Sequence, residues 1–225
     1  MTAANALFGQ LREACAEDWR AYCEHAFVKQ LGAGTLPEAS FRHYLGQDYL
    51  FLIHFARAYA LAIYKADNLA DMRAAAATVT GLLDVEMGLH VKYCAGWGMT
   101  EAGMEKLPEA TATMAYTRYV LERGLSGDAL DLAVALAPCV VGYGEIGRAL
   151  AADPATKKDG NPYADWIDMY AGDEYQEVAR AAVDQLDRLA DARLTPARLE
   201  SLKTTFAQAT RLEAAFWDMG LNLSA

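Results

Sequence analysis

The chain has 225 residues, of which 54% are hydrophobic and 22% are charged. This composition supplies enough apolar side chains for a packed core and excludes a disordered chain. The 30 Asp and Glu residues outnumber the 20 Lys and Arg residues, which gives a formal net charge of −10. This excess of negative charge argues against binding to nucleic acid phosphates or to an anionic membrane surface.

The chain contains four cysteines: Cys15, Cys23, Cys94 and Cys139. They form no C-x-x-C pair, which is unlike a zinc knuckle and favours a reduced, cytosolic setting. The N-terminus has no basic start followed by an apolar stretch, so no signal peptide is predicted. The longest apolar stretch, 132–143, is shorter than the ~20 residues that span a bilayer. We therefore expect a soluble, cytoplasmic protein.

Hydrophobic residues recur three and four positions apart along the chain, whereas no segment alternates with a period of two. We predict an all-α protein with a single domain over residues 1–225, a bundle of seven or eight helices. Ser126 and Thr195 are the predicted N-caps of the fifth and the last helix. Glycine, proline and capping residues indicate these helices in chain order: 5–30, 37–65, 69–94, 108–124, 126–150, 162–172, 173–192 and 196–220.

Two carboxylates interrupt apolar helix faces. Asp48 lies in the apolar stripe that contains Tyr44 and Phe51, and Glu213 shares the core-facing positions of the last helix with Phe216. A buried carboxylate without a partner destabilises a protein strongly. Each is therefore interpreted either as part of a structural network with Tyr, Trp or Arg, or as part of a functional site.

The predicted fifth helix contains Pro138, which removes a backbone hydrogen bond and favours a kink. Cys139 follows at once, and Tyr143 lies one turn further on the same face. A lone buried cysteine is more often a small hydrophobic residue than a nucleophile. Both interpretations of Cys139 stay open at this point.

The four histidines are His25, His43, His54 and His90. No Glu-x-x-His pair is present, so the ligand set of a di-iron carboxylate bundle is missing. His90 and Glu86 lie one turn apart and are interpreted as a pair on one helix face rather than as metal ligands. The chain has no dinucleotide-binding, Walker or G-x-S-x-G motif.

Four segments form a more specific combination: Phe41–Tyr49, Leu136–Cys139 with Tyr143, Trp166–Tyr170, and Glu213–Trp217. Together they resemble the TenA family of thiaminase II or aminopyrimidine aminohydrolase enzymes, and the resemblance extends over nearly the whole chain. It implies an all-α bundle like that of haem oxygenase, without the haem and usually assembled as a homotetramer. It implies no metal and no organic cofactor.

The resemblance also implies a role for each site residue. Cys139 would be the nucleophile, and Glu213 would protonate the leaving group and then help to deliver water. Asp48 would hold the amino group and a ring nitrogen of an aminopyrimidine substrate. The other residues that would contact the substrate are Tyr116, Tyr143, Tyr170, Phe51 and Phe216, the last by stacking on the ring.

Phe51 is a departure from the family pattern, which often has a tyrosine one turn after the aspartate. The resemblance implies that this tyrosine assists the cysteine. Its absence either lowers the reactivity of Cys139 or is compensated by another tyrosine. Because Cys139 is present, the chain resembles the cysteine-bearing branch of the family.

The implied function is hydrolysis of an aminomethyl aminopyrimidine, a thiamin breakdown product, to the hydroxymethyl pyrimidine with release of ammonia. Intact thiamin would be a poorer substrate. One alternative is a ligand-binding or transcriptional regulatory protein without hydrolase activity, although the acidic charge argues against direct DNA contact. Another is a cofactor-free, quinone-forming oxidase on the same helical bundle.

Overall fold

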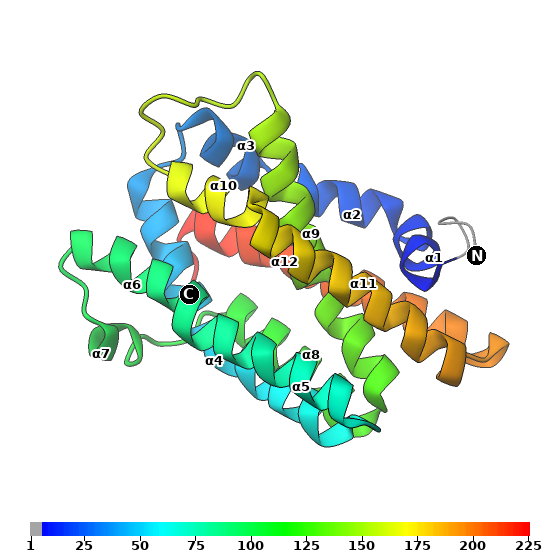
Figure 1. The fold of residues 1–225 in the computed structure, drawn as a ribbon. Helices are drawn as coiled ribbons and strands as arrows, with labels where there is room; N and C mark the ends of the chain where they lie inside the picture. Colours follow the sequence, from blue (N-terminus) through cyan, green and yellow to red (C-terminus); the bar gives the residue numbers. More distant parts are fainter. Residues whose placement is uncertain (1–5) are drawn as a thin grey trace. The chain divides into compact units, whose positions relative to one another are not determined.

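The computed structural model describes residues 6–225, and within this range it contains helices and no β-strand (Figure 1). The predicted all-α class is therefore confirmed. The chain divides into two compact units. The first unit comprises Met1–Pro37 with Ala133–Trp217, and the second comprises Glu38–Leu132 with Asp218–Ala225. The single domain predicted for residues 1–225 stays a prediction.

The first unit contains the N-terminal helices, most of α9 and α12, and the helices that connect these two. Their bounds are α1 (Leu7–Ala14), α2 (Ala16–Cys23), α3 (Ala26–Ala33), α9 (Ala129–Ala152), α10 (Ala164–Ala171), α11 (Asp173–Arg193) and α12 (Pro196–Asn222). In Figure 1, α10 leads almost directly into α11, and α1 packs against α11. The last helix begins at Pro196 as predicted.

The single helix predicted over residues 5–30 is wrong, because the chain leaves helical geometry twice within it. Cys15 separates α1 from α2, and Glu24 and His25 separate α2 from α3. His25 has an extended backbone, and its Nδ1 accepts a hydrogen bond from the Phe27 N–H at 3.2 Å. This side-chain cap begins a new helix, which hydrophobic periodicity cannot distinguish from a continuous one.

Glycines in α9 allow two neighbouring helices to pack directly on its backbone. A Cβ added to Gly142 would lie 2.3 Å from Cε1 of Tyr22 in α2. A Cβ added to Gly147 would lie 2.5 Å from the carbonyl carbon of Tyr170 in α10. The Tyr22 hydroxyl also lies 3.4 Å from the carbonyl oxygen of Pro138, to which it donates. These close approaches determine where α2 and α10 lie along α9.

By length and composition α9 could cross a membrane, but 78% of its most apolar window is buried inside the protein. Burial of this extent is typical of the core helix of a soluble protein.

The second unit is organised around α4 (Glu38–Lys65), along which α5 (Leu69–Thr80) turns back in Figure 1. A π-helical turn, η2 (Gly81–Glu86), joins α5 to α6 (Met87–Gly96). The segment 69–94 is thus helical throughout, as predicted, but the π-helical turn η2 interrupts its α-helical geometry. The short helix α7 (Glu101–Met104) was not predicted, and α8 (Thr111–Ser126) packs against α4.

The predicted N-cap Ser126 is wrong, because Ser126 is the last residue of α8. The next helix begins at Ala129, and Asp128 caps it. The Oδ1 atom of Asp128 accepts hydrogen bonds from the N–H groups of Leu130 and Asp131, at 2.9 and 3.2 Å. A carboxylate two residues later in the chain therefore provides the function assigned to the serine.

Candidate active site

The second unit holds Asp48 in the most buried part of α4, where every residue from Tyr44 to Leu52 is buried. Asp48 is only 3% exposed. The Tyr44 hydroxyl, one turn earlier, donates a hydrogen bond to Asp48 Oδ2 at 3.1 Å. The Nε2 atom of His90 in α6 lies 2.6 Å from the same oxygen. Asp48 thus has two close partners on one carboxylate oxygen.

His90 is fully buried and uses both ring nitrogens. Its Nδ1 lies 2.8 Å from the backbone carbonyl oxygen of Glu86. A carbonyl oxygen only accepts hydrogen bonds, so Nδ1 carries a proton. Burial lowers the pKa of His90, but the hydrogen bond and the negative charge of Asp48 outweigh burial and raise this pKa above its ordinary value.

Sequence reasoning missed His90 as a site residue. The hydrogen bond to Glu86 goes to its backbone carbonyl oxygen, whereas the side-chain hydrogen-bond partner of His90 is Asp48, 42 positions earlier in the chain. One signal could have found it: His90 shares the buried face of α6 with Met87 and Cys94. A histidine between apolar residues at helical spacing requires a polar partner in the core.

Two further predicted residues lie in the second unit beside each other. Phe51, one turn after Asp48 on α4, is 3% exposed, and its ring centroid lies 5.0 Å from that of Tyr116 in α8. Phe51 also stacks on Phe55, with the ring centroids 5.1 Å apart. The side chain at position 51 therefore forms part of a buried aromatic wall next to the Asp48 turn.

In the first unit, Cys139 lies on α9 directly after Pro138 and is 9% exposed. Tyr143 follows one turn later on the same helix. Its ring lies 4.9 Å from that of Tyr170 in α10 and 5.3 Å from that of Trp217 in α12. The structure thus brings the predicted tyrosines 143 and 170 into contact, as members of one aromatic cluster.

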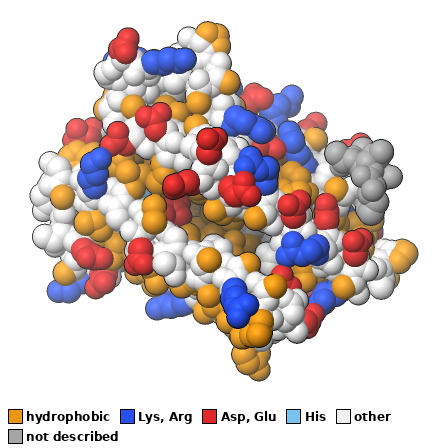
Figure 2. Space-filling view, in the orientation of Figure 1, with side chains coloured by type: hydrophobic (Ala, Val, Ile, Leu, Met, Phe, Trp, Pro, Cys, Tyr) orange, Lys and Arg blue, Asp and Glu red, His pale blue; other side chains and the backbone are white. Residues whose placement is uncertain are grey.

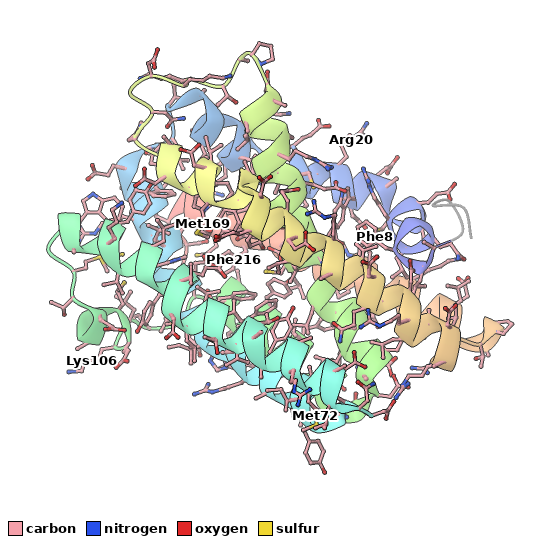
Figure 3. The ribbon with its side chains drawn as sticks, viewed as in Figure 1. Phe8, Arg20, Met72, Lys106, Met169 and Phe216 are labelled. Atoms are coloured by element: carbon pink, nitrogen blue, oxygen red, sulfur yellow. The ribbon has the colours of Figure 1, made fainter. Side chains whose placement is uncertain are left out.

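Glu213 and Phe216 lie on α12, each 2% exposed. Figure 3 labels Phe216 on this helix. Burial raises the pKa of the Cys23 thiol, and the negative charges of Glu145 and Glu213 raise it further. Cys23 therefore lies within electrostatic range of the candidate acid, and sequence reasoning did not single it out. Among residues 6–225, no group of three or more His, Cys, Asp or Glu side chains is placed to hold a metal ion.

The predicted residues thus fall into two sets. The second unit contains Asp48, Phe51 and Tyr116, and the first unit contains Cys139, Tyr143, Tyr170, Glu213 and Phe216. Buried carboxylates, a buried thiol and aromatic side chains are the groups that bind flat heteroaromatic rings and carry out acid–base and nucleophilic chemistry. The fold is that of an all-α protein, and residues of these types are found in enzymes of this class that act on small aromatic substrates.

Comparison with known proteins identifies the family within this class. The sequence profile of the TENA/THI-4/PQQC family matches residues 12–223, and the chain belongs to this family. The chain is 37% identical over 204 residues to an aminopyrimidine aminohydrolase of Halalkalibacterium halodurans, covering 91% of this chain and 90% of that protein. It is 43% identical over 206 residues to an uncharacterised protein of Haemophilus influenzae, covering 92% and 94% of the two chains.

Solved structures agree with this assignment. A crystal structure described as a TenA family transcription regulator, from Silicibacter sp. TM1040, superposes with a TM-score of 0.90 at 48% sequence identity. The match covers 96% of each chain. The expected resemblance to the TenA family and its helical fold is therefore confirmed.

Proposed function

We propose that this chain is an aminopyrimidine aminohydrolase of thiamin salvage, which converts an aminomethyl aminopyrimidine into the hydroxymethyl pyrimidine and ammonia. The observation that carries the proposal is the buried Asp48 carboxylate, held by Tyr44 and His90, in a chain related to a named aminopyrimidine aminohydrolase. A buried carboxylate is an acceptor that suits the N–H groups of an exocyclic amine. Intact thiamin would be a poorer substrate.

In the proposed reaction, the Cys139 thiolate adds to a ring carbon and forms a C–S bond. The displaced ring electrons move to a ring nitrogen, which takes up a proton. The loss of aromaticity allows the 5-substituent to depart, so that one difficult step becomes two easier ones. Water then adds at the exocyclic carbon, and departure of the thiolate, with loss of the proton that the ring nitrogen took up, restores the aromatic ring.

Glu213 is the proposed acid for the departing amine. It protonates the nitrogen so that ammonia leaves, and it then takes a proton from the attacking water. Burial of a carboxyl group favours its neutral form, which is the form needed to donate a proton near neutral pH. Tyr116, Tyr143, Tyr170, Phe51 and Phe216 are the proposed aromatic contacts to the substrate, since aromatic walls bind flat rings and exclude water.

The same family relationship underlies three further proposals, on domain organisation, assembly and localisation. We infer that the chain acts as a single domain, that it assembles as a homotetramer, and that it works in the cytoplasm. The reduced state of its described cysteines is compatible with a cytoplasmic setting.

The test of the function is ammonia release from an aminomethyl aminopyrimidine by the purified protein. Wild-type protein should release ammonia and the hydroxymethyl product in equal amounts, and Cys139→Ala should release almost none. Absence of ammonia release from a folded wild-type protein would contradict the proposal. Thiamin assayed under the same conditions would give the order of preference between the two leaving groups.

A regulatory function is the second candidate, because the Silicibacter relative is described as a transcription regulator. On the face drawn in Figure 2, Lys and Arg side chains are interspersed with Asp and Glu. A phosphate-binding surface instead clusters its cations. A gel-shift assay at moderate salt tests this candidate, and tight, sequence-selective DNA binding would favour it over the hydrolase.

A further inference from the structure

His90 is the only described histidine whose two ring nitrogens are both engaged in the buried interior of the second unit, and none of the reaction steps proposed above uses it. Its Nδ1 proton is committed to the Glu86 carbonyl oxygen at 2.8 Å. Its Nε2 lies 2.6 Å from Asp48 Oδ2, at the short end for a charge-assisted N–H···O hydrogen bond. One proton occupies this contact, and it resides either on Nε2 or on Oδ2.

The surroundings of Asp48 favour the proton on His90. The Tyr44 hydroxyl also donates to Oδ2, so this oxygen accepts from two directions, which stabilises the ionised carboxylate. An imidazolium beside a carboxylate keeps the buried pair neutral as a whole, and a buried charge requires such a partner. The hydrogen bonds from Tyr44 and His90 both end on Oδ2, and neither uses Oδ1.

We propose that His90 is a positioning residue for aminopyrimidine recognition, whose imidazolium holds Asp48 ionised through Oδ2 and leaves Oδ1 as an acceptor for the exocyclic amino group. This inference rests on the proposed function of Asp48 in substrate binding. A carboxylate can only accept hydrogen bonds, whereas a carboxylic acid would donate one. The proton on His90 thus determines whether the site selects rings that bear an amino group.

His90→Gln is the decisive variant, because the glutamine amide can still donate to Asp48 but carries no charge. Without a cation beside it, the buried Asp48 carboxylate loses the partner that balances its charge. Isothermal titration with the hydroxymethyl aminopyrimidine, and with the analogue that lacks its exocyclic amino group, measures the selectivity. The wild type should prefer the amino compound, and His90→Gln should reduce this preference about tenfold or more while one site per chain remains.

His43→Gln is the matched control, because His43 lies on α4 but its Nε2 contacts the Ser224 carbonyl oxygen at 3.0 Å instead of Asp48. It should leave the selectivity unchanged. A merely structural role of His90 would lower the fraction of binding-competent chains and leave the ratio of the two affinities intact. An unchanged ratio in folded His90→Gln would therefore overturn the inference.

Nitrogen-15 NMR of the wild-type histidines tests the charge of His90 without any ligand. At pH 7 both ring nitrogens of His90 should carry protons, and a neutral ring would overturn the inference. If His90→Gln does not fold, the His90 signals can be assigned as those that shift in Asp48→Asn. The wild-type spectrum then decides whether the His90 ring is charged. Failure of the proposed function would appear differently, as a wild-type protein that neither releases ammonia nor binds the pyrimidine.

Discussion

The backbone of Tyr170 in α10 passes so close to Gly147 in α9 that a Cβ on Gly147 would lie 2.5 Å from the Tyr170 carbonyl carbon. The absence of a side chain at position 147 therefore determines how near Tyr170 comes to α9. On the same helix, Tyr143 contacts the Tyr170 ring at 4.9 Å. The position of one predicted substrate contact thus depends on a glycine outside the recognised motifs.

Gly147→Ala is expected to destabilise the protein by about 1–3 kcal/mol, because the added methyl group meets backbone atoms that cannot rotate away. Chemical denaturation measures this free energy of unfolding. Gly88→Ala in α6 is the control, since a Cβ there has no neighbour within 4 Å. It should leave stability unchanged or raise it by up to about 1 kcal/mol through helix propensity. Equal stability of the two variants would contradict the packing argument.

Asp48→Asn is expected to weaken binding of the pyrimidine product while the helical fold is retained. The amide is neutral and presents a donor where the carboxylate accepts, so it matches the amino group of the ligand poorly. Isothermal titration gives the affinity, and circular dichroism checks the fold. Unchanged affinity would return Asp48 to the interpretation as part of a structural network.

The same Asp48→Asn variant should lower the pKa of His90. In the wild type, Asp48 raises this pKa above the ordinary value of 6.5 against the opposing effect of burial. Without the negative charge, burial dominates and disfavours the imidazolium. NMR titration should therefore show an imidazolium that persists above pH 6.5 in the wild type and a neutral ring at neutral pH in the variant. A wild-type His90 ring that is already neutral at pH 6.5 would contradict the prediction that Asp48 raises the pKa of His90.

Glu213→Gln is expected to reduce turnover far more than affinity, because an amide cannot donate and recover a proton. General acid–base groups contribute about 10²–10⁴-fold to rate, which sets the expected loss. Steady-state kinetics of ammonia release, together with titration of the product, separates the two effects. A loss of turnover below about tenfold would mean that Glu213 is not the main acid.

Alkylation should label Cys139 before the other three cysteines. Burial raises the pKa of the Cys94 thiol to about 11 and also raises those of Cys15 and Cys23, so these thiols are poorly ionised at neutral pH. Cys23 is the informative comparison, because it is more exposed than Cys139. Peptide mapping after limited alkylation measures the order of labelling.

Pyrimidine product should slow the labelling of Cys139 selectively, since a bound ring would cover its sulfur. Cys139→Ala should keep the helical circular dichroism and lose nearly all hydrolysis, because it removes one small group. An active alanine variant, or a Cys139 that is neither labelled nor protected, would return this residue to the role of core filler.

The sequence alone determined the features that depend on near neighbours along the chain. Periodicity identified the all-α class, and local stop and start signals located α4 and the beginning of α12, because helices form through contacts three and four residues apart. For the same reason, the four-residue spacing within one helix predicted that Tyr143 lies one turn after Cys139. The roles of the site residues came instead from the family resemblance, since spacing cannot distinguish a nucleophile from a buried hydrophobic residue.

Only the tertiary structure decided which buried polar groups meet. Asp48 and His90 lie on different helices, and no local pattern links them. Their contact arises because α4 and α6 pack side by side and a buried carboxylate must find a partner within the core. The sequence did not predict the helix interruptions at Cys15 and His25 for a related reason. An apolar stripe continues across a break whenever the next helix buries the same side of the chain, so the break appears only once the helices are packed.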